Sequence, residues 1–398
     1  MSKHKILSLT ETCTGCFACA NACPKDAITL PPNFEGFYFP AIDVNKCVDC
    51  GLCDKVCPQI NDNVAIHTMQ GAYYGWSTDN DIRKESSSGG LFYYLATSVL
   101  NEGGVVYGAS FNYEGLVRLE CHSTEEVSLK SLMRSKYVQN YIGYAYRGIR
   151  RDLRSGKIVL YCCTPCQAAG LKAYLGRDYE NLICVDFICH GVPSMDMLQK
   201  HLQYLRIDKV KEINFRPKNR SWVDDFEIRY TTKGRKKIRL CRIPWEFDEY
   251  FWSFQTYKNI RRSCRNCAYC NGNRAADITL ADFWGIKRYK PELWDVKGQS
   301  LVLVNTHKGE MVTRALQAFN ELHLDTLPVE YAQYVYERVR TTEDSPYQNK
   351  TRDSFLKDVY TIGYKNAIVK YGFSKPSSSL IRYRAISFLS KVKKSIFK

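Results

Sequence analysis

The chain has 398 residues, of which 45% are hydrophobic and 25% charged, a composition that is ordinary for a globular protein of two or three domains. Its 57 Lys and Arg residues outnumber its 41 Asp and Glu residues, which gives a formal net charge of +16. No zinc finger, RNA-recognition signature or basic zipper accompanies this charge, which argues against a nucleic-acid-binding protein.

Eighteen cysteines are the unusual feature of the composition. The N-terminus lacks the apolar run of a signal peptide, and no stretch is long and apolar enough to span a bilayer. We therefore expect a cytoplasmic protein, in which cysteines serve ligation or redox chemistry rather than structural disulfides.

A duplicated cysteine motif occupies residues 1–66, where C-x2-C-x2-C-x3-C-P occurs twice. Three thiolates on one loop bind three corners of a 4Fe-4S cube, and the fourth reaches the other cube. The pattern assigns Cys13, Cys16, Cys19 and Cys57 to cluster 1, and Cys23, Cys47, Cys50 and Cys53 to cluster 2. Paired zinc knuckles are the alternative, but they lack this crossed arrangement. The segment resembles the bacterial two-cluster ferredoxins. Two neighbouring clusters transfer electrons to an acceptor, so we expect a further redox site in the rest of the chain.

From residue 67 to residue 345 the pattern changes to short apolar runs followed by helices. We predict strands within 103–111, 157–163, 181–189, 276–283 and 299–306. The predicted fold is α/β, a small ferredoxin-like domain followed by a larger, mixed and mostly parallel sheet covered by helices. Residues 346–398 form a predicted C-terminal helical segment. In such sheets ligands collect beyond the carboxyl ends of the strands.

Cysteines fall at two of these strand ends. Cys166 follows one strand, Cys189 closes the next, and Cys264 and Cys267 come from a later loop with C-x2-C spacing. Together they would form a third four-thiolate site, cluster 3, that is drawn from three segments. Cys270 is an alternative ligand for the same site.

Six sequence blocks carry a resemblance to a known family. They are SSSGGLFYYLATSVL (86–100), CTPCQAAGLKAYL (163–175), DFICHGVPS (186–194), SCRNC (263–267), ADITLADFWG (276–285) and KGQSLVLVNTHKG (297–309). With the ferredoxin module, they resemble the coenzyme F-420 hydrogenase/dehydrogenase beta-subunit family. The resemblance implies a flavin, FAD or FMN, beside an additional 4Fe-4S cluster. It further implies an oxidoreductase that passes electrons between ferredoxin-type clusters and a deazaflavin or another conjugated organic substrate.

The predicted flavin contacts come from two segments. Ser88 and the preceding serines are expected to cap a helix, while Gly89 and Gly90 would let backbone amides approach a phosphate. Helices also begin in this way without any ligand. Asp282 and Trp284, at the end of a strand, could bond to or pack on the flavin ring, or could belong to the core.

Two further hypotheses remain open. His190 follows a predicted cluster ligand, and it is either a structural turn residue, a hydrogen-bond partner of the cluster or a catalytic proton donor to the substrate. The segment Cys163-Thr-Pro-Cys166 also fits a thioredoxin-like arrangement, which would leave the later cysteines unexplained.

A relay subunit without its own substrate, serving a redox partner protein, is the alternative to an oxidoreductase. A substrate-sized cavity against the flavin would distinguish the two.

The last residues, 376–398, carry apolar side chains at helical spacing and six basic but no acidic residues. Residues 380–398 could therefore lie on an anionic membrane surface, at the inner face of the membrane. Packing on the body of the protein, a frayed solvated tail, or binding to an acidic partner are the alternatives.

Overall fold

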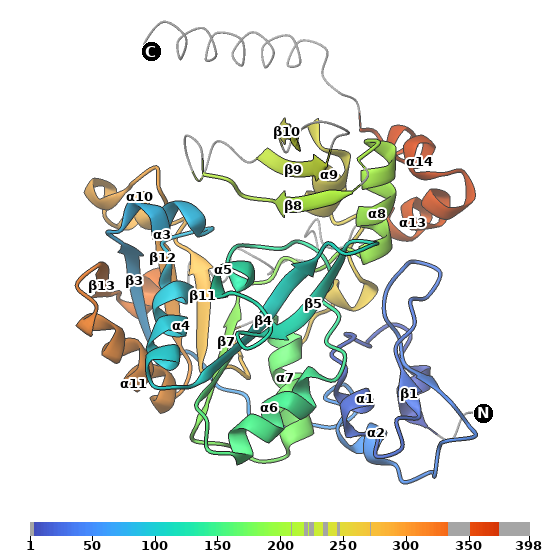
Figure 1. The fold of residues 1–398 in the computed structure, drawn as a ribbon, viewed down its shortest axis with the longest axis horizontal. Helices are drawn as coiled ribbons and strands as arrows, with labels where there is room; N and C mark the ends of the chain where they lie inside the picture. Colours follow the sequence, from blue (N-terminus) through green and yellow to red (C-terminus); the bar gives the residue numbers. More distant parts are fainter. Residues whose placement is uncertain are drawn as a thin grey trace, which may run out of the picture.

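Figure 1 shows the computed structural model of the protein, which describes residues 4–207, 209–218, 222, 227–233, 238–244, 247–270, 272–332 and 351–373. The ferredoxin module contains η1 (Lys5–Ser8), α1 (Ala18–Ala22), β1 (Ile28–Thr29), β2 (Ala41–Ile42) and α2 (Leu52–Lys55). Strands β1 and β2 pair antiparallel. Each short helix begins inside a cysteine loop, after a residue in the left-handed conformation, Phe17 (φ 66°) or Gly51 (φ 70°).

The body of the protein is built on an eight-stranded sheet in the order β13-β3-β12-β11-β7-β6-β4-β5. Its strands are β3 (Gly71–Ser77), β4 (Val105–Asn112), β5 (Arg118–Ser123), β6 (Val159–Cys162), β7 (Leu182–Phe187), β11 (Ile278–Asp282), β12 (Ser300–Val304) and β13 (Leu322–Thr326). The central strands β4, β6, β7 and β11 are parallel, whereas β5, β12, β3 and β13 add antiparallel pairs at both sides. The predicted mixed α/β fold is confirmed, and its parallel part is these four strands.

Helices cover the sheet, as Figure 1 shows. They are α3 (Asn80–Glu85), α4 (Leu91–Asn101), α5 (Leu129–Leu132), α6 (Ala145–Arg154), α7 (Pro165–Leu175), α10 (Ile286–Tyr289) and α11 (His307–Ala315), with η4 (Pro291–Leu293) and η5 (Leu316–Ala318). Helices α8 (Met195–Tyr204) and α9 (Glu249–Gln255) pack against each other on another side of the molecule, and η3 (Arg262–Cys264) follows α9 in the chain. Both ends of helix α7 are capped. Thr164 and Gln167 form a capping box at its N-terminus, and Gly176, in the left-handed conformation, is the C-cap.

A second, antiparallel sheet was not predicted. Its strands are β8 (Val210–Asn214), β9 (Glu227–Lys233) and β10 (Ile238–Pro244). Helices α13 (Arg352–Thr361) and α14 (Tyr364–Lys370) pack together on this side of the molecule, next to α8. The predicted tail, residues 376–398, and the predicted boundary at residue 345 lie outside the described residues.

The ferredoxin module packs against α6 and α7 and shares one hydrophobic core with them. Arg147 of α6 donates hydrogen bonds to the carbonyls of Ala20, Asn21 and Cys23, which holds the end of the first cysteine loop. Within the ranges that the structure describes, no helix combines the length and the apolar character needed to cross a bilayer.

Candidate functional site

The four cysteines assigned to cluster 1 lie close enough to interact. Burial, together with the nearby thiolates of Cys57 and Cys13, raises the pKa of Cys16 to about 12. Burial also raises the pKa of Cys19 well above its usual range. The other three thiols of the set raise this pKa as well, by a smaller amount. Closely spaced thiols that oppose one another's ionisation fit a site in which iron supplies the compensating positive charge.

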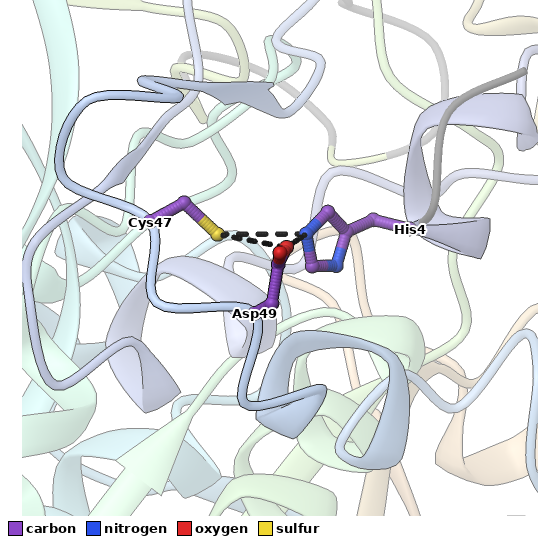
Figure 2. Close-up of side chains that lie close together, drawn as sticks. All are labelled: His4, Cys47 and Asp49. Atoms are coloured by element: carbon purple, nitrogen blue, oxygen red, sulfur yellow. Dashed lines mark hydrogen bonds and ion pairs between the residues drawn. The ribbon is translucent and has the colours of Figure 1, made fainter.

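The cysteines assigned to cluster 2 line one small cavity. The Ala27 amide donates to Cys23 Sγ at 3.3 Å, an interaction that favours a thiolate. In Figure 2, the ring of His4 points toward Cys47 and Asp49, with His4 Nε2 3.4 Å from Cys47 Sγ and 3.1 Å from Asp49 Oδ1. Because Cys47 belongs to the predicted cluster set, His4 is better placed as a hydrogen-bonding neighbour of that cluster than as part of a separate metal site.

A cavity of about 500 Å³ lies beyond the carboxyl ends of β6, β7 and β11. The cysteines predicted for cluster 3 line it, as does the alternative ligand: Cys166, Cys189, Cys264, Cys267 and Cys270. Thr14 and Gly15, from the cluster 1 loop, reach the same cavity. The structure therefore brings the cluster 3 cysteines together from three segments, beside the ferredoxin module.

Cys166 is the centre of this third group. Burial raises its pKa well above the usual range, and the thiolates of Cys267, Cys189 and Cys264 raise it further. The Gly191 amide donates to Cys189 Sγ at 3.4 Å. A reactive thioredoxin-type cysteine has a lowered pKa, so these surroundings favour ligation over thiol–disulfide exchange.

The other end of the cavity is formed by the turn before α4. Ser88 Oγ donates to the Gln299 carbonyl at 2.6 Å, and the Gly89 amide donates to Ser300 Oγ at 2.8 Å. A Cβ on Gly89 would stand 2.3 Å from the Gly75 carbonyl oxygen, so this glycine permits close packing of the turn on β3. The prediction that the serines cap α4 is wrong, because the N-cap is Gly90 (φ 99°) and has no side-chain cap.

Basic side chains that the sequence did not single out lie at this end of the cavity. Burial lowers the pKa of Lys136 to about 7, and its ammonium donates to the carbonyls at the end of α5. Arg216 Nη1 lies 2.5 Å from Asp282 Oδ2, so the predicted flavin contact Asp282 is held in an ion pair. Trp284 is 48% exposed and stacks on Trp222, with ring centroids 4.6 Å apart. Both Asp282 and Trp284 line the cavity.

His190 also lines the cavity, and both of its ring nitrogens have protein partners. Its Nε2 lies 3.2 Å from the Phe254 carbonyl, which can only accept, so Nδ1 accepts from the Tyr257 hydroxyl at 3.2 Å. The ring stacks on Tyr257 with centroids 4.1 Å apart. This geometry favours a structural role for His190, or a role as a neighbour that tunes the cluster. A catalytic role for His190 stays a prediction.

Comparison with known proteins finds two family matches along the chain. Residues 12–60 match the 4Fe-4S dicluster domain, and residues 156–329 match the C terminus of the coenzyme F420 hydrogenase/dehydrogenase beta subunit. The resemblance inferred from the sequence blocks is thus confirmed, and the second match contains all five candidate cysteines of cluster 3.

The curated relatives match only the ferredoxin module, over 13% of this chain. A ferredoxin-like protein in the nif region of Azotobacter vinelandii is 36% identical over 59 residues, which is 58% of its length. A polyferredoxin-like protein of Methanocaldococcus jannaschii is 38% identical over 58 residues, 34% of its length, and ferredoxin-1 of Caulobacter vibrioides is 35% identical over 52 residues, 42% of its length. The chain therefore spans about a third to three fifths of these proteins.

Among solved structures, a chain of the F420-reducing [NiFe] hydrogenase complex from Methanosarcina barkeri has a TM-score of 0.46 and 15% identity. The similarity covers 77% of this chain and 96% of that chain, and it is too weak to support a function. The two family matches are the firm result. The chain joins a segment that matches the 4Fe-4S dicluster domain to a region that matches the C-terminal family of the coenzyme F420 hydrogenase/dehydrogenase beta subunit.

Proposed function

We propose that the protein is an iron-sulfur flavoprotein oxidoreductase that passes electrons between ferredoxin-type clusters and a conjugated organic substrate. The observation that carries this proposal is the continuity of the cavity. Its walls include Thr14 and Gly15 of the cluster 1 loop, the cysteines of cluster 3 and the turn before α4. When bound, the clusters supply one-electron transfer and the flavin supplies exchange between one and two electrons.

Cys166, Cys189, Cys264 and Cys267 are the proposed ligands of cluster 3. Support comes from the neighbours of Cys166, because its thiol interacts with the other three and Cys270 is not among the main influences on its pKa. Cys270 remains the alternative ligand, since it lines the same cavity.

The flavin would occupy the end of the cavity between the turn before α4 and Trp284. The first turn of α4 and the basic Lys136 favour a phosphate there, because helix N-termini and cations both stabilise anions. The side chain of Lys218 donates to the Ser88 carbonyl, and burial lowers its pKa to about 7, so a bound phosphate would favour its charged form. Trp284 offers an exposed aromatic face for a ring system.

The size of the cavity favours an organic cofactor or substrate beside cluster 3. A volume of about 500 Å³ lies within the range of small-molecule sites, which is roughly 300–1,000 Å³. The family name makes a deazaflavin, coenzyme F420, one substrate to test.

Iron and acid-labile sulfide analysis of anaerobically reconstituted, full-length protein tests this proposal. Three 4Fe-4S clusters predict about twelve irons per chain. The Cys264→Ser variant should lose about four, whereas the Cys270→Ser variant should keep all of them. A count of about eight irons per chain in the unmodified protein would refute the assignment of cluster 3. Acid-released flavin is identified by chromatography, and a reconstituted protein that binds no flavin would refute the oxidoreductase mechanism.

A further inference from the structure

Arg261 carries a buried positive charge without a counter-charge. Its side chain is 1% exposed, and its Nη1 and Nη2 atoms are buried without a hydrogen-bond partner. Two other arginines are equally buried, but Arg352 pairs with Glu35 at 2.8 Å and Arg274 lies 3.6 Å from Asp186. Within the described ranges, Arg261 forms no such ion pair. An isolated buried charge is strongly destabilising, so the position implies a negative group that faces it.

The side chain of Arg261 lies between two cluster loops. Its Nε donates to the Cys13 carbonyl at 2.7 Å, and its Nη1 lies 3.2 Å from the position that a Cβ on Gly15 would take. Its own carbonyl accepts from the Cys264 amide at 3.0 Å. The guanidinium therefore reaches the loop of cluster 1 from the segment that carries two proposed ligands of cluster 3.

A second buried donor without an acceptor points at the same loop. Gln139 Oε1 accepts from the Tyr38 amide at 3.3 Å, which leaves Nε2 directed toward Gly15 without a partner. The hydroxyl of Ser263 is likewise buried and without a partner. Several buried donors that lack acceptors predict an acceptor-rich anion. The thiolate and sulfide sulfurs of a 4Fe-4S cluster have this character.

We propose that Arg261 is a tuning residue that raises the reduction potential of cluster 1. Reduction adds one electron, and therefore one negative charge, to the cluster, and a nearby buried cation stabilises that charge. The amide of Gln139 supports the same effect through a hydrogen bond. The inference rests on the proposed ligand set of cluster 1. It goes beyond that assignment by naming the residue that adjusts electron transfer between the ferredoxin module and cluster 3.

A purely structural role is the competing explanation, because Arg261 also packs over Phe39, 4.2 Å from the ring centroid, and holds the Cys13 carbonyl. Two variants separate charge from structure. Arg261→Lys keeps the charge but changes the hydrogen bond, whereas Arg261→Gln keeps a donor but removes the charge. Arg262→Gln is the matched control, because the charge of Arg262 is already offset by Glu11 at 2.6 Å.

The experiment is a dithionite titration of reconstituted, full-length protein, followed by electron paramagnetic resonance and accompanied by iron analysis. At a fixed potential the reduced-to-oxidised ratio of cluster 1 should fall about tenfold in Arg261→Gln, which corresponds to about 59 mV for one electron. In Arg261→Lys and Arg262→Gln, this ratio should differ from that of the unmodified protein by no more than about twofold, which is clearly smaller than the tenfold effect. Equal ratios in Arg261→Gln and the unmodified protein would overturn the proposal, as would equal losses in Arg261→Lys and Arg261→Gln.

Iron analysis covers the case in which a variant does not assemble cluster 1. Loss of about four irons in Arg261→Gln, but not in Arg261→Lys, would also support a requirement for charge. The same loss in both variants would assign Arg261 a structural role. An unmodified protein without the dicluster signals would refute the cluster assignment itself, which is a different result from an unshifted Arg261→Gln variant.

Discussion

Replacing Gly170 by Ala tests how the ferredoxin module contacts the body of the protein. Gly170 lies on α7, one helical turn after the proposed ligand Cys166. A Cβ at this position would stand 2.7 Å from Cys16 Cβ and 2.9 Å from Cys16 Sγ. The added methyl group would therefore collide with a proposed ligand of cluster 1.

Two opposing effects set the expected magnitude. Alanine in a helix interior is about 1 kcal/mol more favourable than glycine. Overpacking a buried contact costs about 1–3 kcal/mol, so the folded chain should lose at most about 2 kcal/mol. To restore ordinary contact with the new methyl group, Cys16 must move by about 1 Å. Metal–ligand distances tolerate only about 0.2 Å, so we expect cluster 1 to be affected far more than folding.

The assay combines iron analysis, paramagnetic resonance and denaturant unfolding of the Gly170→Ala variant. We expect the loss of about four irons with a small change in the free energy of unfolding. Gly148→Ala is the control, because Gly148 lies in α6 and the nearest atom to its Cβ would be the Tyr107 hydroxyl, at 3.0 Å. If Gly170→Ala keeps its full iron content and gains about 1 kcal/mol, Cys16 does not lie against α7 in this way.

Three further predictions concern other parts of the molecule. Arg352→Met removes the ion pair with Glu35 at 2.8 Å and leaves this buried carboxylate with Arg262, 3.7 Å away, so it should lower the free energy of unfolding by about 1.5–3 kcal/mol in denaturant curves, with part of the loss recovered when Glu35 also becomes Met. Burial raises the pKa of Asp186 to about 6, so the stability from its bound proton is present below about pH 4 and lost as the pH rises through about 6. The stability of Asp186→Asn relative to the unmodified protein should therefore rise by about 1 kcal/mol between about pH 5 and about pH 7. Full-length protein should sediment with anionic liposomes at low salt and dissociate at high salt, whereas a chain truncated after Gly372 should not, and equal behaviour would return residues 376–398 to ordinary packing.

The sequence predicted what depends on local spacing or on strand ends. The ligands of clusters 1 and 2 were proposed from a contiguous motif, and Cys166 and Cys189 were placed at one sheet edge because parallel strands end together. The antiparallel strands β3 and β13 were missed because their pairing partners lie far apart along the chain. Strand β5 pairs with the preceding strand β4, and this local hairpin was missed as well. The alternation within 227–244 is a signal that would have predicted the β9–β10 hairpin.

Several residues around the cavity were not predicted from the sequence for a different reason. Lys136, Gln139 and Arg216 lie on connections between regular elements, with no motif to mark them. Their roles depend on burial and on absent hydrogen-bond partners, and neither property can be read from composition. Arg261 had one usable signal, its place three residues before Cys264, but a basic residue beside a cysteine is ordinary in a chain with this net charge.

The arrangement of the proposed clusters explains why the ferredoxin module is held so firmly. Cys50 of the proposed cluster 2 is exposed, and Val44 and Val48, which are near it in sequence, have exposed apolar side chains, so this cluster would lie at the protein surface. The thiols of cluster 1 are more buried, and Cys16 lies against the helix that carries Cys166. Because the rate of electron transfer falls steeply with distance, a module that moved by a few ångströms would break the path to the cavity. The buried contact at Gly170 therefore helps to keep the proposed cluster 1 beside the helix that carries Cys166.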